Sequence, residues 1–222
     1  MMDWSAFSLS IQLAVSTLLV LLPLGLWAGR WLARTEFKGR AWLEAAILLP
    51  LVLPPTVMGY YLLVAVGGGS PIGQWLQNNW GVSLTFNFSG LLLASVLFNI
   101  PFMFQPIQRA FESIPHNLNE AAEVSGLSTW AIFLKVELPL AWPGILSAMV
   151  LTFVHTLGEF GVVLMIGGSI PGETRTLAIS IYDSVQSFDM RAAHVMSLAL
   201  LLFSLAAVAA SLLLSGRKRH NK

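Results

Sequence analysis

The sequence predicts an all-α membrane protein with five transmembrane helices, and three observations lead to this fold class. Hydrophobic residues make up 56% of the 222 positions and charged residues only 10%, whereas an ordinary globular domain carries about 25% charged residues. Five apolar runs reach roughly the 20 residues that cross the hydrocarbon core of a bilayer. Lysine and arginine gather in alternate connecting segments. Together these observations exclude a single-anchor protein and a large enzyme domain outside the membrane.

The chain is expected to form one domain, residues 1–222, built from the five apolar runs. The expected spans cover residues 9–32, 43–66, 90–107, 138–166 and 192–214. The second run contains Pro50, Pro54 and Pro55, which lack a backbone N–H, so its helix should break inside the bilayer. Such a break either lines a path between the helices or is a kink that serves packing alone, and the sequence leaves both interpretations open.

The positive-inside rule gives the orientation. With the N-terminus outside, 10 of the 12 lysine and arginine residues fall on the cytoplasmic side. These ten are Arg30, Arg34, Lys38, Arg40, Arg109, Lys135, Arg217, Lys218, Arg219 and Lys222. Only Arg175 and Arg191 then lie outside, and the C-terminus is expected in the cytoplasm.

Two connecting segments are expected to form short helices at the outer membrane surface. Residues 71–88 are of mixed polarity, and their tryptophans Trp75 and Trp80 suit an interfacial helix. Residues 176–190 place apolar side chains at helical spacing but are too short and too polar to span. We expect an amphipathic helix there, with an ordered loop as the alternative.

Residues 117–139, between the third and fourth spans, form the one connecting segment long enough to dock a partner. Pro115 and Asn117 are helix-start signals. Ser125 and Gly126 then predict a break, after which a second helix should end at Pro139. Because this segment joins two spans directly, a force applied to it would reach both.

The same segment carries a motif with fixed spacing. Its residues are Glu120, Ala121, Ala122, Gly126, Val136, Leu138 and Pro139. This pattern resembles the signature of the integral membrane permeases of ABC importers, with Val136 in place of the usual isoleucine. The alternative that the residues alone allow is a cytoplasmic helical hairpin without a partner.

The resemblance implies a MetI-like permease fold with a cytoplasmic coupling helix between helices 3 and 4. It implies a homodimer in a bacterial cytoplasmic (inner) membrane, two copies of an ATP-hydrolysing subunit and an extracytoplasmic binding protein, with no nucleic acid. ATP and Mg²⁺ would bind to the ATPase, so this subunit would hold no cofactor and catalyse no reaction. The residues agree, because the chain has no cysteine, no Walker-type loop and no histidine pattern with metal-ligand spacing.

Three further stretches resemble the molybdate branch of these permeases. They are residues 49–60, 157–161 and 170–176. The resemblance therefore implies molybdate import, with tungstate or sulfate as alternative substrates. A stand-alone secondary transporter is a less favoured alternative, since such proteins usually show internal repeats and none is found here. A membrane-embedded enzyme would need more clustered ionisable residues than the single pair formed by His155 and Glu159.

Candidate residues for the translocation path or its gate follow from their polarity or flexibility at membrane depth. They are Pro54, Pro55, Asn99, His155, Gly158, Glu159 and Gly161. His155 and Glu159 are four residues apart and share a helix face, and ionisable residues in a membrane usually face the protein interior. For Glu159 we favour a structural or gating role over contact with an anion. Arg175 and Arg191 are candidates for the outer mouth, where they would attract an anion or pair with the binding protein; solvated surface charges are the alternative.

Overall fold

The structure is a computed structural model that describes residues 1–216, and within this range every regular element is a helix. Four helices are long and apolar enough to cross a membrane, and a bent pair of helices makes a fifth crossing. This agrees with the five predicted spans. The predicted cytoplasmic cations Arg217, Lys218, Arg219 and Lys222 lie outside the described residues.

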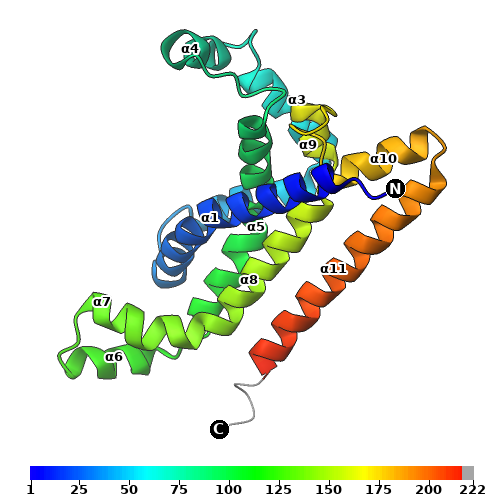
Figure 1. Cartoon of the computed structure of the whole chain (residues 1–222). Helices are drawn as coiled ribbons and strands as arrows, with labels where there is room; N and C mark the ends of the chain where they lie inside the picture. Colours follow the sequence, from blue (N-terminus) through cyan, green and yellow to red (C-terminus); the bar gives the residue numbers. More distant parts are fainter. Residues whose placement is uncertain (217–222) are drawn as a thin grey trace.

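Three long helices form the core of the bundle: α1 (Trp4–Arg34), α5 (Phe88–Glu112) and α8 (Leu138–Gly158). Figure 1 shows them crossing at the centre of the molecule. Their contact is apolar, and its largest fully buried side chains include Leu21, Met103, Ile107 and Ile145. A membrane gives no hydrophobic drive between helices, so this close packing is what holds them together.

Asp3 fixes the outer end of α1. Its carboxylate accepts a hydrogen bond from the Ala6 backbone N–H at 3.0 Å and one from the Ser180 hydroxyl at 3.0 Å. Partial burial acts to raise the pKa of Asp3, but these bonds and one from Ser5 together hold that pKa below its ordinary value. A helix cap of this kind contributes about 0.5–2 kcal/mol, and here it also joins the start of α1 to α10.

The second predicted span is a broken pair, α2 (Arg40–Val52) and α3 (Pro55–Val66), whose axes differ by 108°. The last backbone bond of α2 runs from Leu53 N–H to Leu49 O. Pro54 and Pro55 have no N–H to continue the ladder, and Pro55 begins α3, where a missing donor costs nothing. The prolines therefore break the span as the sequence indicates.

The fourth predicted span is shorter than expected. We expected an apolar helix over residues 138–166, but α8 ends at Gly158 and a separate helix, α9 (Gly161–Gly167), follows. Between them Glu159 has an extended backbone, with φ −67° and ψ 127°. Its side chain is bound by groups on α5, which hydropathy along the chain does not reveal.

Two further helices lie near the outer end, and a long one completes the bundle. They are α4 (Pro71–Trp80), α10 (Leu177–Gln186) and α11 (Met190–Gly216). The helix expected within residues 176–190 is thus confirmed as α10. Figure 1 shows α11 leaning away from the centre. Only 11% of its most apolar 18-residue window is buried within this chain, so most of its surface is free for lipid or another subunit.

Candidate functional site

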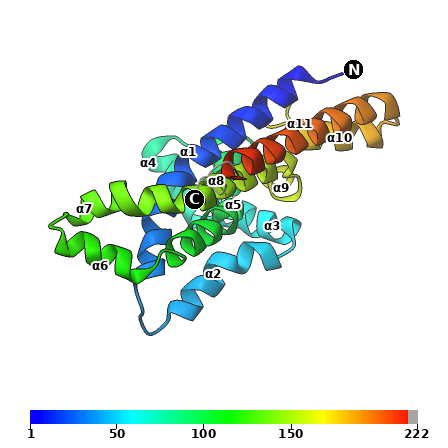
Figure 2. The same cartoon turned by 90° about the horizontal axis from the view of Figure 1, so that it is seen from below.

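The predicted docking segment forms a helical hairpin: α6 (His116–Val124), a turn, and α7 (Thr129–Ile132). Figure 1 shows it projecting from the end of the molecule opposite to α4, and Figure 2 shows α6 and α7 side by side. Gly126 makes the turn with φ +78°, a backbone conformation that strongly favours glycine. The Ser128 hydroxyl then caps α7 by accepting the Ala131 N–H at 3.3 Å. The break expected at Ser125 and Gly126 is confirmed.

The second helix of the hairpin does not end at Pro139, contrary to the sequence-based expectation. After α7 the chain makes one π-helical turn, η1 (Phe133–Glu137), and continues directly into α8. The N–H of Leu138 reaches back five residues to the carbonyl of Phe133. Pro139, which has no N–H to donate, directly follows this turn, where the backbone hydrogen-bond spacing changes from five residues to four. The hairpin and the α8 span are therefore one continuous rod.

The motif residues divide between an exposed face and a buried one. Glu120 and Ala121 are exposed, Ala122 is buried, and the neighbouring Val124 is 90% exposed. Among the described residues, the one ion-pair or hydrogen-bond partner of the Glu120 side chain is the exposed His116, at 3.2 Å. This face of the projecting helix α6 is suited to contact with a partner protein, because it presents a carboxylate, a small side chain and an exposed apolar side chain. Val136 and Leu138 are half-buried at the start of the rod, and Pro139 is exposed.

Glu137 joins this rod to α1. Its side chain is completely buried and lies 2.5 Å from Arg30 Nε and 2.6 Å from Arg34 Nη2. The two arginines are one helical turn apart on α1, so a single carboxylate receives both guanidinium groups. In the sequence motif the position of Glu137 can hold any residue, so Glu137 was not among the candidates. The signal that could have identified it is an acid at a span boundary, to be matched with the cations at the end of the first span, 107 residues away from Glu137 at Arg30.

A second bond holds α6 against the same helix. With its amide oxygen turned toward α1, the buried Asn119 accepts hydrogen bonds from Arg34 at 2.6 and 3.1 Å. Arg34 thus contacts both arms of the hairpin. A movement of the hairpin would therefore be passed to α1 as well as to α8.

The cytoplasmic ends of α2 and α5 are joined by their own polar cluster. Arg40 lies 2.8 Å from Glu44 and 2.7 Å from Glu112. Gln108 donates to both of these carboxylates at 2.9 Å. These bonds hold the broken span beside the bundle on the side where the docking hairpin projects.

At membrane depth the structure brings three candidate residues together: Asn99, His155 and Glu159. The Asn99 amide donates to Glu159 Oε2 at 3.1 Å, and its oxygen accepts from His155 Nδ1 at 2.9 Å. Because an amide oxygen only accepts, His155 carries its proton on Nδ1. Ser95, which was not among the candidates, donates to Glu159 at 3.0 Å, and Thr17 donates to Ser95 at 3.0 Å, which completes the network.

This network connects α1, α5 and the break between α8 and α9. Thr17, Ser95 and Asn99 have no solvent exposure, and Glu159 has 4%. His155 is stacked on Phe102, with ring centroids 3.9 Å apart. Glu159 Oε1 and Thr152 Oγ1 are buried without a hydrogen-bond partner in the described structure. Buried polar groups are rarely left in this state, so the network suits an element that rearranges.

The remaining path candidates contribute no side-chain hydrogen bond to this buried network. Pro54, Pro55 and Gly158 are exposed in the single chain. Gly161 lies where α9 meets α3, because a Cβ added there would come within 2.9 Å of the Pro55 Cβ. The candidates therefore fall into two groups: the buried hydrogen-bonded network, and the bend of the backbone, where Pro54 and Pro55 are exposed.

The two arginines predicted for the outer mouth differ in their surroundings. Arg175 lies 3.5 Å from Asp183 and donates to the Ser169 hydroxyl at 3.0 Å. Arg191 is exposed at the start of α11. Arg175 is thus part of the fold of the outer loop, and Arg191 is the better placed of the two to meet an incoming molecule.

A polytopic helical bundle with a projecting cytoplasmic hairpin, and a polar network at membrane depth, defines the membrane subunit of a transporter. Among residues 1–216 no group of three His, Cys, Asp or Glu side chains is placed to hold a metal ion. The chain belongs to the family described as binding-protein-dependent transport system inner membrane component, whose model matches residues 22–220. It is therefore a non-catalytic inner-membrane subunit of an ABC transporter.

Named relatives cover most of the chain. It is 46% identical to the molybdenum transport system permease protein ModB of Azotobacter vinelandii, over 91% of this chain and 89% of the relative. It is 40% identical to the ModB protein of Haemophilus influenzae, over 84% of this chain and 81% of the relative. A probable sulfate transport system permease of Chlorella vulgaris is 35% identical, over 90% of this chain and 75% of the relative.

A solved structure confirms the fold. A bacterial ABC transporter that imports the acidic polysaccharide alginate contains a chain similar to this one, with a TM-score of 0.76 at 18% identity. The match covers 96% of this chain and 78% of that chain. The ABC importer permease fold predicted from the sequence is therefore present.

Proposed function

We propose that this chain is the permease subunit of an ATP-driven importer of molybdate. The observation that carries the proposal is the gradient of identity among relatives, from 46% and 40% for molybdenum permeases to 35% and 31% for sulfate permeases. The outer loop at residues 170–176, which resembles the molybdate branch, supports the same choice. Sulfate is the second candidate because its permeases match nearly the whole chain.

The proposed machine contains two copies of this chain, two ATPase subunits that bind ATP and Mg²⁺, and an external molybdate-binding protein. The projecting hairpin would sit in a groove on the ATPase. The exposed Glu120, Ala121 and Val124 form the surface that supports this docking. When ATP closes the ATPase dimer, the two hairpins would move together and turn the path toward the outside.

The rod and its ion pairs supply the connection between docking and path. A displaced hairpin carries α8 with it, and Glu137 passes the displacement to Arg30 and Arg34 on α1. Both helices enter the polar network around Asn99 and Glu159. We therefore assign this network to the gate, as a brace that changes partners when the path opens.

The path itself would be weakly polar. Molybdate is a tetrahedral dianion, and a tight cationic site at membrane depth would hold it rather than pass it on. The exposed bend at Pro54 and Pro55, with Gly158 on α8, offers backbone groups and no fixed charge. Such irregular backbone is tolerated at membrane depth where it faces protein or a water-filled path, so we place the path along this bend, facing the second copy.

Deleting the gene tests the substrate. Cells without it, grown in nanomolar molybdate, should contain less molybdenum than the parent strain, and excess molybdate should restore the content. Adding tungstate as a competitor then asks whether the two oxyanions share the route. Unchanged molybdenum together with reduced sulfate uptake would contradict the molybdate assignment and favour sulfate.

A further inference from the structure

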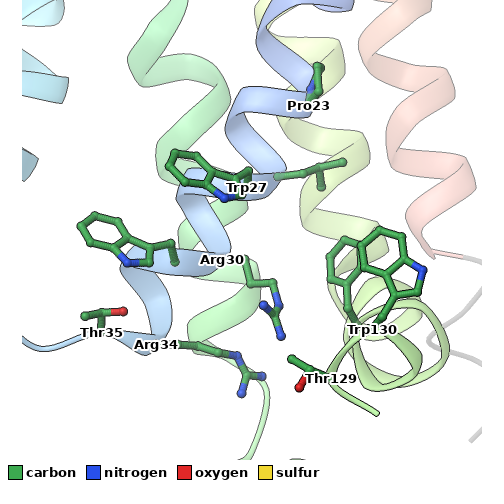
Figure 3. A pocket seen from close by; sticks show the side chains of 10 residues that line it. Pro23, Trp27, Arg30, Arg34, Thr35, Thr129 and Trp130 are labelled. Atoms are coloured by element: carbon green, nitrogen blue, oxygen red, sulfur yellow. The ribbon is translucent and has the colours of Figure 1, made fainter. Parts of the chain in front are cut away.

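A groove of about 700 Å³ opens between the cytoplasmic half of α1 and the rod formed by α7 and η1. Figure 3 shows the side chains that line it. The rod contributes Thr129, Trp130 and Phe133 to the lining. The other side is lined by α1 and by Thr35, which follows it; the residues are Pro23, Leu26, Trp27, Arg30, Trp31, Arg34 and Thr35. Its volume lies within the range of about 300–1,000 Å³ that is typical of small-ligand sites.

The groove is polar at one end and apolar at the other. Figure 3 places Pro23 at one end and Arg34, Thr35 and Thr129 at the other, with Trp27 and Arg30 between. Pro23 and Thr35 are 12 positions apart in the sequence, which corresponds to about 18 Å along a helix. A ligand that fills this groove must therefore be an elongated amphiphile.

The charge of the lining selects an anion. Arg30 and Arg34 are 27% and 30% exposed and share the single carboxylate of Glu137, so the group as a whole carries one positive charge. No acidic side chain of the described chain lines the groove. The hydroxyls of Thr35 and Thr129 add donors at the same end, and such donors suit phosphate oxygens.

The position of the groove identifies the source of that anion. The orientation derived from the cations places Arg30 and Arg34 at the cytoplasmic surface of the bilayer, where the anionic phospholipids lie. Trp27, Trp31 and Trp130 are 72%, 42% and 68% exposed around the groove, which suits the headgroup level of a membrane. Basic pockets between helices on this side are known to take anionic headgroups.

We propose that this groove binds one anionic phospholipid of the cytoplasmic leaflet, with its phosphate at Arg30 and Arg34 and an acyl chain along Trp27 toward Pro23. The lipid then contacts α1 and the docking rod at once, beside the Glu137 ion pairs. The bound lipid thus forms part of the contact between the docking hairpin and α1, and it can exchange with the bilayer. Membrane composition therefore affects how strongly movement of the hairpin is passed to α1. This proposal requires only a membrane location and does not depend on the substrate assignment.

Native mass spectrometry of the purified transporter complex tests the proposal, with phosphatidylglycerol and phosphatidylcholine as the lipid probes. The wild-type complex should retain phosphatidylglycerol in preference to phosphatidylcholine. Arg34→Gln should weaken retention about fivefold, the effect of one cation near an anionic headgroup, while Arg30 still pairs with Glu137. Trp27→Ala removes an exposed groove wall without touching the ion pairs and should also reduce retention.

Trp4→Ala is the matched control, because Trp4 lies on the same helix at its outer end and is 70% exposed. It should leave retention unchanged. Equal retention of the two lipids, or normal retention by both groove variants, would overturn the proposal. A photo-crosslinking amino acid in place of Trp130 should capture lipid; capture of another subunit instead would show that protein fills the groove and would also overturn it.

Discussion

Glu137 illustrates how one side chain determines the mechanical connection of the docking rod. It is completely buried and faces two arginines that remain partly exposed. Removing the carboxylate would leave two cations beside each other without a counter-charge. Because the arginines still reach water, the cost should fall below the 3–5 kcal/mol of a fully buried pair.

We predict that Glu137→Gln lowers the free energy of unfolding by about 1–3 kcal/mol, as expected for charged groups that lose their hydrogen-bond partner. The thermal unfolding midpoint of the purified complex measures this change, and transport is assayed in parallel. The control is Glu123→Gln on the exposed face of α6, where a surface change should stay within about 0.5 kcal/mol. Equal midpoints for the two variants would show that the ion pairs add nothing.

Asn99 has the corresponding role at membrane depth, because its amide joins α5 to both His155 and Glu159. We predict that Asn99→Leu destabilises the protein by about 1–3 kcal/mol for each partner left unsatisfied, and that transport falls with it. Gln105→Leu on the same helix is the control, since Gln105 is exposed. If Asn99→Leu has normal stability and transport, the network has no role in the gate.

Glu159→Gln separates charge from hydrogen bonding in the same network. The glutamine oxygen still accepts from Ser95 and Asn99, so the free energy of unfolding should change by less than about 1.5 kcal/mol, the net value of one hydrogen bond. Transport should nevertheless slow, because the proposed gate uses the carboxylate. If the variant transports at the normal rate, Glu159 is structural only.

At the scale of elements, the sequence predicted what depends on neighbours along the chain. The five apolar crossings, the break before Pro54 and Pro55, and the hairpin turned at Gly126 all follow from local hydropathy, proline and glycine. The end of α8 at Gly158 and the π-helical turn before Pro139 did not follow. At the end of α8 Glu159 is bound by groups on α5, and the π-helical turn contains Glu137, which is paired with arginines on α1.

Glu159 meets Ser95 and Asn99 across 64 and 60 residues, and Glu137 meets Arg30 across 107. Single-sequence patterns carry no information on such pairs. Intramembrane polarity was enough to select Asn99, His155 and Glu159 as candidates, but not to show that they touch. Glu137 was missed because at a span boundary an acid is indistinguishable from a solvated surface charge.

The docking hairpin gives a prediction at this scale. Gly126→Pro forbids the positive φ that the turn requires, and Glu120→Arg reverses an exposed charge on α6. Both variants should insert in the membrane, while the ATPase subunit no longer copurifies with them. Gly81→Pro is the matched control, because Gly81 also has positive φ and a bonded N–H but lies at the outer end. Copurification that survives both hairpin changes would contradict docking at this segment.

The whole molecule presents surfaces that a single chain does not cover. The face of α11 and the bend at Pro54 and Pro55 are exposed. The hairpin projects (Figure 1), and the groove proposed for a lipid lies between α1 and the rod (Figure 3). Each surface corresponds to a different component of the proposed assembly: lipid or a second copy, the transported anion, the ATPase and the cytoplasmic leaflet. In the proposed assembly the chain therefore acts as a connector between these components.

The central claim is that this connector couples ATP hydrolysis to molybdate import. The most direct measurement is uptake of radiolabelled molybdate by proteoliposomes that contain the permease, its ATPase and the binding protein. We predict uptake that requires ATP and the binding protein and that persists in excess sulfate. Uptake without ATP, or uptake abolished by sulfate with sulfate itself transported, would contradict it.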